Sequence, residues 1–384
     1  MERFKELRED IKKDFNEKWE KITASPITKL YLFMSILQTI VVSILQIRVF
    51  IRNYGFIKYQ ISLYEFQAIN KFKCEIVKHQ FPYIPFDNAF YIFFQLFQLY
   101  FSFDSVIKQH TIQIITITAL NFAWALYGIV QVLEIIISIN RILPFSNCLH
   151  QPNFYPHILA YDFPSFLLQI FFAIMMTMLS YRFSKFFGWE LYKKIGGNYE
   201  LQKIYQNRLI FIMLLKITFF FLILLFTPFV AMTTLKDRGI FSQYLPYVIF
   251  HSFTTALSFI LMFVAFRSVS KESRKGLTVF LLLWSIVIID FIIILVGSIQ
   301  FFRSVGNVWI FLIILLILLL LLSVFLVIYG VKVLSAFDSG LKELLTQKDK
   351  EEVTTTVPLN QIWDDLEIEI DSVKEEKKWT IDDE

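Results

Sequence analysis

The stretch VWIFLIILLILLLLLSVFLVIYGV at residues 308–331 contains no charged side chain and consists almost entirely of Leu, Ile, Val and Phe. A helix needs about 20 predominantly apolar residues to cross the hydrocarbon core of a bilayer. The stretch therefore predicts a membrane-spanning helix. Because it is so uniformly Ile and Leu, we expect it to face lipid on most sides.

Seven further apolar stretches precede it, so the sequence predicts an all-α, polytopic transmembrane helical bundle of about eight spans within residues 29–333. Only 18% of the chain is charged and 56% is hydrophobic, whereas about a quarter of a soluble chain is charged. The lipid bilayer is thus the expected partner. The second span is the weakest, because it is short and carries Gln95 and Gln98. The predicted spans are Leu30–Ile47, Phe86–Phe103, Ile112–Ile139, Ile158–Ser180, Leu209–Leu235, Leu245–Phe266, Leu277–Phe301 and Val308–Val331.

Residues 1–28 form a separate N-terminal unit. Six apolar residues recur there at spacings of three and four, which predicts an amphipathic helix. We expect it to lie at the membrane surface or on the bundle, with binding of a protein partner as the alternative. Ser25 and Pro26 then predict the start of the first span, with Ser25 as the N-cap. The six apolar residues are Phe4, Leu7, Ile11, Phe15, Trp19 and Ile22.

Residues 334–384 form a polar, acidic tail. From Ser335 onward it carries fifteen acids and six lysines, a composition typical of disorder. The tail is a candidate binding segment for proteins. Asp365 and Glu367 resemble a di-acidic signal for exit from the endoplasmic reticulum, with simple solubilising charge as the alternative.

Basic residues predict the orientation, because they concentrate in cytoplasmic loops. With a cytoplasmic N-terminus, 26 of the 37 Lys and Arg lie on the cytoplasmic side and 10 on the other, Lys216 lying within a span. Both termini are therefore expected in the cytoplasm. Cys74 and Cys148 fall on the opposite side, where they either form a disulfide or remain as free thiols.

Ionisable groups inside spans are costly, so each is a candidate functional residue. Asp290 lies about 20 Å into the seventh span at a rise of about 1.5 Å per residue, where it either lines a polar cavity or makes a structural hydrogen bond. Lys216 is explained by snorkelling to the nearby cytoplasmic surface, although a pair with Asp290 is an alternative. Glu134 is expected at the membrane interface.

The other polar groups in the spans are expected to form hydrogen bonds between helices. No His box, phosphate-binding loop or nucleophile elbow occurs in the sequence. We therefore expect no enzymatic activity, no cofactor and no nucleic-acid partner. These polar residues are Asn121, Gln131, Gln169, His251 and Gln300.

The sequence FGWELYKKIG at residues 187–196, followed by Leu201, Tyr205 and the LLK and FFF triplets at 214–216 and 219–221, resembles a signature of fungal Golgi-apparatus membrane proteins of unknown function. Thr218 stands where that family has an acid two residues after the lysine, so any partner of Lys216 has to come from elsewhere. The resemblance implies residence in the Golgi membrane and a fungal-type source, and no chemistry. The matching positions outside the two triplets are Gly188, Trp189, Tyr192, Lys193, Ile195, Gly196 and Tyr205.

Three functions remain open from the sequence. The first is a multi-pass Golgi or other endomembrane protein that organises trafficking. The second is a small-solute or proton-coupled transporter that uses Asp290. The third is a receptor-like membrane sensor.

Overall fold

The computed structural model describes residues 25–66, 84–108, 110–142, 154–195, 199–234, 240–305 and 310–337, together with single residues between 8 and 23. Nearly all of the described residues are α-helical, and those described between 8 and 23 are helical as well. Cys74, Cys148, Gly196 and the acidic tail beyond residue 337 lie outside the described residues. The predictions made for them remain predictions.

Eight of the described helices are long and apolar enough to cross a membrane. This confirms the predicted all-α, polytopic bundle and makes the chain a multi-pass membrane protein. The helices are α2 (Pro26–Phe66), α4 (Ile84–Ile107), α5 (Thr111–Ile142), α6 (Phe154–Ile195), α7 (Tyr199–Thr234), α8 (Ile240–Lys271), α9 (Arg274–Val305) and α10 (Ile310–Ser335).

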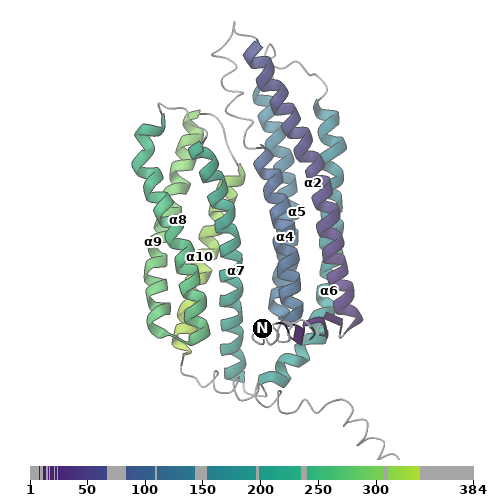
Figure 1. Cartoon of the computed structure of the whole chain (residues 1–384), viewed down its shortest axis with the longest axis vertical. Helices are drawn as coiled ribbons and strands as arrows, with labels where there is room; N and C mark the ends of the chain where they lie inside the picture. The colour runs from purple at the N-terminus through teal and green to yellow at the C-terminus, as the bar shows by residue number, and fades with distance from the viewer. Residues whose placement is uncertain are drawn as a thin grey trace, which may run out of the picture.

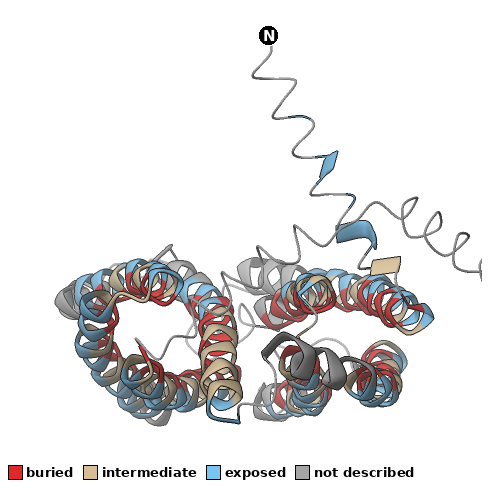
Figure 2. Cartoon of the chain, turned by 90° about the horizontal axis from the view of Figure 1, so that it is seen from below, coloured by how far each residue is buried: buried red, intermediate tan, exposed pale blue. Residues whose placement is uncertain are grey.

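The helices form two groups of four, and consecutive helices within each group run antiparallel. The two groups lie side by side (Figure 1, Figure 2). In the N-half, helices α2, α4, α5 and α6 each pack on the next, and α2 closes the ring on α6. In the C-half, α7, α8, α9 and α10 repeat this arrangement, and α10 closes on α7. Helices α4 and α5 contact the C-half through α7 and α10. Helix α2 begins and helix α10 ends at the lower end of the bundle in Figure 1. We call this end of the bundle the tail end and the opposite end the far end.

Local sequence sets where the helices start and stop at the tail end. The Ser25 hydroxyl accepts a hydrogen bond from the Ile27 amide at 3.2 Å, so the predicted N-cap before Pro26 is confirmed. Helix α8 ends at Lys271, and Glu272 follows with a φ of 53°. A residue in this left-handed region reverses the chain and allows α9 to begin at Arg274.

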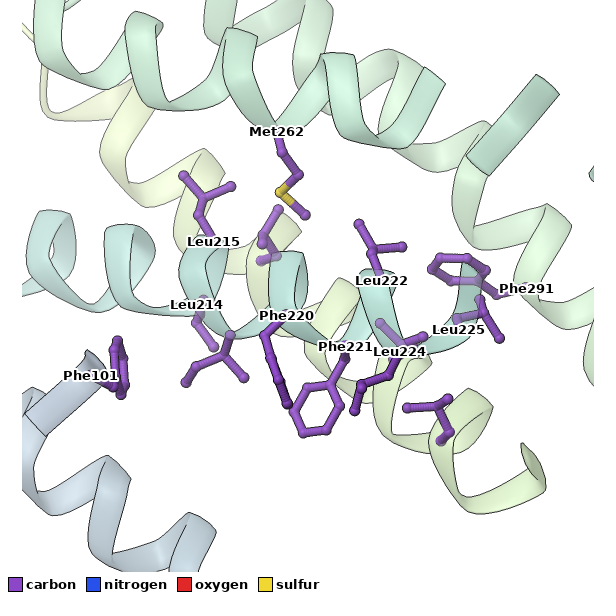
Figure 3. Close-up of a cluster of buried hydrophobic side chains, with 14 of the residues drawn as sticks. Phe101, Leu214, Leu215, Phe220, Phe221, Leu222, Leu224, Leu225, Met262 and Phe291 are labelled. Atoms are coloured by element: carbon purple, nitrogen blue, oxygen red, sulfur yellow. The ribbon is translucent and has the colours of Figure 1, made fainter. Parts of the chain in front are cut away.

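Among the eight candidate spans, the span in α7 is the most buried, because α7 packs within the C-half and also contacts α4 and α5 of the N-half. Figure 3 shows buried side chains of this segment, among them Leu215, Phe220 and Leu222, in one cluster with Phe101 of α4, Met262 of α8 and Phe291 of α9. Leu215 and Leu222 are fully buried there. The FFF triplet at 219–221 thus belongs largely to this core.

Two of the sequence predictions need correction. Helix α10 packs against α7 and α9 and buries Phe311, Leu315, Leu319 and Leu326 among others, so it does not face lipid on most sides. Apolar side chains suit both lipid and a packed core, and composition alone cannot distinguish them. Helix α6 continues to Ile195, fifteen residues beyond the end predicted at Ser180, so residues 187–195 form its last turns.

Gly330 allows close packing of α10 within the C-half. A Cβ atom at this position would lie 2.8 Å from Leu281 Cδ2 and 3.1 Å from Phe211 Cε2. Overpacking of a core costs about 1–3 kcal/mol. We therefore expect Gly330→Leu to lower the melting temperature of the purified protein in detergent. Gly297→Leu is the control, because no neighbouring atom lies within 4 Å of a Cβ there, and equal melting of the two variants would contradict the prediction.

Candidate functional site in the polar core of the N-half

Helix α2 is polar on its buried face and apolar on its exposed face. Its apolar residues Ile40, Ile44, Ile47 and Ile51 are exposed toward the lipid side. The stripe faces the interior of the bundle, away from water. Its polar side chains therefore need hydrogen-bond partners on the neighbouring helices. The buried polar residues of α2 are Thr28, Ser35, Gln38, Thr39, Gln46 and Asn53, at spacings of three, four and seven.

Five buried amide side chains, one or two from each N-half helix, meet in the middle of the bundle. We call these residues, Gln38, Gln95, Gln98, Asn121 and Gln169, the amide ring. Gln38 Nε2 donates to Asn121 Oδ1 at 2.8 Å, and Gln98 Nε2 donates back to Gln38 Oε1 at 3.1 Å. Gln95 Nε2 donates to Gln169 Oε1 at 3.2 Å, and Gln169 Nε2 to Asn121 Oδ1 at 3.1 Å. All five are at most 2% exposed.

The amide ring has more hydrogen-bond donors than it uses. Asn121 Nδ2 is buried and has no hydrogen-bond partner. Gln38 Nε2 also lies 3.3 Å from Gln98 Oε1 and 3.4 Å from Gln95 Oε1, so its two hydrogens cannot serve all three neighbouring oxygens and an acceptor is left over as well. A buried donor without a partner costs roughly 1–3 kcal/mol. The ring is therefore able to donate to another acceptor.

A second set of buried polar contacts lies between the amide ring and the far end. Gln46 Nε2 donates to the Ser165 hydroxyl at 2.9 Å, and Asn88 Nδ2 donates to Gln46 Oε1 at 3.0 Å. Asn53 Nδ2 in turn donates to Asn88 Oδ1 at 2.9 Å. These bonds join α2, α4 and α6 about one to four turns beyond the amide ring at 3.6 residues per turn.

An ion pair ends this series at the far end. Arg52 Nη1 lies 2.5 Å from Asp162 Oδ2, and the two side chains are only 13% and 5% exposed. Arg52 Nη2 also donates to Asn53 Oδ1 at 2.6 Å, and its guanidinium lies 5.6 Å from the centre of the Tyr161 ring. Arg48 lies 5.8 Å from the same ring.

At the tail end, Asp104 of α4 joins the two halves. Its carboxylate binds Lys216 of α7 and accepts a hydrogen bond from Gln113 Nε2 at 2.9 Å. It also pairs with Lys108 at 2.7 Å. Partial burial would lower the pKa of Lys108, but its hydrogen bond to Asp104 and the opposite charge prevail and raise that pKa.

The polar residues extend over most of the thickness of a membrane. From Ser35 to Asn53, α2 rises about 27 Å at about 1.5 Å per residue, against a hydrocarbon core about 30 Å thick. The amide ring lies near the middle of the candidate spans of α4, α5 and α6 and near the Ser35 end of this stretch of α2, and it contains no charged side chain. We call residues Ser35 to Asn53 of α2 and their partners on α4, α5 and α6 the polar core.

Asp290 forms a separate site inside the C-half. It accepts a hydrogen bond from the Thr254 hydroxyl at 2.5 Å, and its other carboxylate oxygen lies 2.5 Å from His251 Nδ1. Lys216 pairs with Asp104, so the alternative pair of Lys216 with Asp290 is not formed. The interhelical role expected of His251 is confirmed.

Glu134 is the last residue of the candidate span Thr111–Glu134, which agrees with the expected position near a membrane interface, but its side chain is buried within the protein. It is 6% exposed, and its Oε1 accepts a hydrogen bond at 2.9 Å from the amide of Ile310, the first residue of α10. A carboxylate at a helix N-terminus satisfies free amides and is stabilised by the helix dipole. Glu134 therefore ties the N-half to the C-half at the far end.

The resemblance residues lie near the tail end. Gly188, Trp189, Tyr192, Lys193 and Ile195 fall in the last turns of α6. Tyr205 falls in the second turn of α7. Lys216 has the acidic partner that Thr218 does not provide, and this partner is Asp104 on another helix.

Three buried or half-buried acids were missed in the sequence analysis. Asp87 and Asp162 lie within predicted spans, and Asp104 follows one directly. Their presence in or beside apolar stretches was the available signal. The polar stripe of α2 was also missed, although its spacing is helical and four of its six residues lie within the predicted first span, Leu30–Ile47.

No family model, curated protein or solved structure matches this chain. The function is therefore inferred from the geometry of the polar core and from the sequence.

The contact between Asp104 and Lys216 allows a direct test of how the halves are joined. Asp104→Asn leaves the Lys216 ammonium, only 12% exposed, without its counter-charge, and breaking such a pair costs about 3 kcal/mol. We expect a clear drop in the melting temperature in detergent. Lys108→Gln is the control, because Lys108 is 49% exposed and an exposed pair contributes less than about 1 kcal/mol. A melting temperature for Asp104→Asn as high as that of Lys108→Gln would contradict this role.

Proposed function

We propose that this protein is a transporter that lets small polar solutes cross the membrane through the polar core of the N-half. The observation that carries the proposal is the amide ring, with five buried amides from four helices and a buried donor without a partner, Asn121 Nδ2. Hydrogen bonds between membrane helices stabilise a bundle by only about 0.6 kcal/mol each on average. Stability alone gives little reason to bury so many polar groups in series.

The ends of the polar core support the same function. A solute that enters at the far end meets Arg52 and Asp162 bound to each other, an arrangement that opens only when both charges find other partners. At the tail end it meets Asp104 with Lys108 and Lys216. Polar groups inside membrane proteins characteristically mark substrate pathways. Paired charges at both ends would restrict access to the neutral middle.

Flux measurements in vesicles test the proposal. The purified protein is reconstituted in phospholipid vesicles, and vesicle volume is followed by light scattering after an osmotic step with urea or glycerol. We expect faster solute entry than in protein-free vesicles, and loss of most of this gain in Gln38→Leu, which cannot bond to the other amides. If wild-type vesicles admit neither solute faster than empty ones, the proposal is wrong.

Asp290→Asn is the matched control, because it removes a buried carboxylate from the C-half and leaves the amide ring intact. We expect it to keep wild-type flux. Loss of flux in Asp290→Asn together with normal flux in Gln38→Leu would move the pathway to the C-half, as the sequence hypothesis of a transporter using Asp290 holds.

We further propose that the protein resides in the Golgi or another endomembrane with both termini in the cytoplasm, and an organising role in trafficking is the second candidate function. The resemblance over residues 187–221 supports the location, and the distribution of basic residues supports the orientation. Trp189 and Tyr192, in the last turns of α6, are the residues through which a trafficking partner would bind.

Microscopy of a tagged full-length chain tests these points. We expect the tagged protein to overlap with a Golgi marker, and tags at both ends to be accessible when only the plasma membrane is permeabilised. The trafficking role predicts that Trp189→Ala with Tyr192→Ala leaves the protein folded while membrane cargo is mislocalised. Plasma-membrane staining would contradict the location, and normal cargo distribution would contradict the trafficking role.

A further inference from the structure

The amide ring has the chemistry of a selective binding site. Its members come from α2, α4, α5 and α6, so a solute at the bundle axis would be within reach of all four helices. Each primary amide offers two donor hydrogens and one acceptor oxygen. The oxygens of Asn121 and Gln38 already accept hydrogen bonds at 2.8 to 3.1 Å, while Asn121 Nδ2 donates to none. The site therefore has spare donors.

The position of the ring makes it unsuited to ions. Gln38, Gln95, Asn121 and Gln169 are fully buried and Gln98 is 2% exposed, and none of the five carries a charge. Along the helices, Asp104 lies six residues from Gln98 and Asp162 seven residues from Gln169, about 9 to 11 Å away at about 1.5 Å per residue, and both acids are already paired with cations. An ion in such a low-dielectric site without a counter-charge pays a large desolvation cost.

A neutral solute does not have the large desolvation penalty of an ion. Its carbonyl or hydroxyl oxygen can accept from Asn121 Nδ2, and its own N–H or O–H groups can donate to ring oxygens. Each amide–amide bond that opens is replaced by an amide–solute bond of similar strength. A solute with only apolar surface would leave the opened amides without partners, at a cost of roughly 1–3 kcal/mol for each group.

We propose that the amide ring is the selectivity site for transport and binds small neutral solutes that carry both an acceptor oxygen and N–H or O–H donors, such as simple amides and polyols. Asn121 is the residue that decides the class, because it provides the donor that no side chain occupies. This inference rests on the proposed transport function.

Charge introduced at Asn121 tests the inference. Asn121→Asp has nearly the same shape but replaces the free donor with a carboxylate, which repels acceptor oxygens and attracts cations. In reconstituted vesicles we expect urea and glycerol flux to fall about tenfold, and guanidinium, a cation of the size of urea, to gain entry. Asn121→Ser keeps a small donor and should retain part of the urea flux while still excluding guanidinium. Wild-type protein should admit urea and exclude guanidinium.

The outcomes separate this inference from the transport proposal. Wild-type vesicles without any solute flux would overturn the transport proposal itself. Wild-type flux that admits guanidinium as readily as urea, or an Asn121→Asp variant with an unchanged solute preference, would overturn the selectivity site alone. If Asn121→Asp does not fold, the wild-type comparison of urea with guanidinium and the Asn121→Ser variant decide the matter.

Discussion

A polar group surrounded by hydrocarbon has to find its hydrogen-bond partner within the protein, and this constraint shapes the N-half. Gln38, Gln95, Asn121 and Gln169 could not face lipid without loss of their hydrogen bonds, so all four helices turn these residues toward one axis. The exposed residues of α2, such as Ile40 and Ile44, show the complementary preference. The arrangement reverses that of a soluble bundle, in which the apolar stripe faces inward.

The C-half uses the opposite chemistry. Its interior is filled by Phe, Leu and Trp side chains, among them Phe280 and Trp284, whose rings stack 5.3 Å apart. Between the halves, aromatic residues of α4 and α5 meet α7 and α10: Phe97 stacks on Phe220 at 4.1 Å and Phe90 on Phe311 at 4.9 Å. Charged groups close this seam at both ends, through Asp104 at the tail end and Glu134 at the far end. Apolar contacts are non-directional, and the charged groups fix the register of one half on the other.

The number and type of the helices follow from apolar content alone, because a span of about 20 residues is a local property. The N-cap at Ser25 is local too and was predicted correctly. Partners were not predictable, because they depend on which helices become neighbours. Lys216 was assigned to the surface or to Asp290, yet its partner Asp104 lies 112 positions away in the sequence. The role of Glu134 was not predictable either, because its partner is the backbone amide of Ile310, the first residue of a helix in the other half.

The two buried polar sites differ in a way that bears on where function resides. Asp290 has both carboxylate oxygens engaged, one by His251 and one by Thr254, and residues of an apolar core surround it. Such a closed site holds α8 to α9 and offers nothing further to a ligand. The amide ring keeps the donor of Asn121 unused, and further buried polar residues, Gln46, Asn88 and Asn53, lie between it and the far end. A buried group without a hydrogen-bond partner gains free energy when a solute supplies one, and a satisfied group does not. This difference, more than the depth of any single charge, favours the N-half as the functional part of the protein.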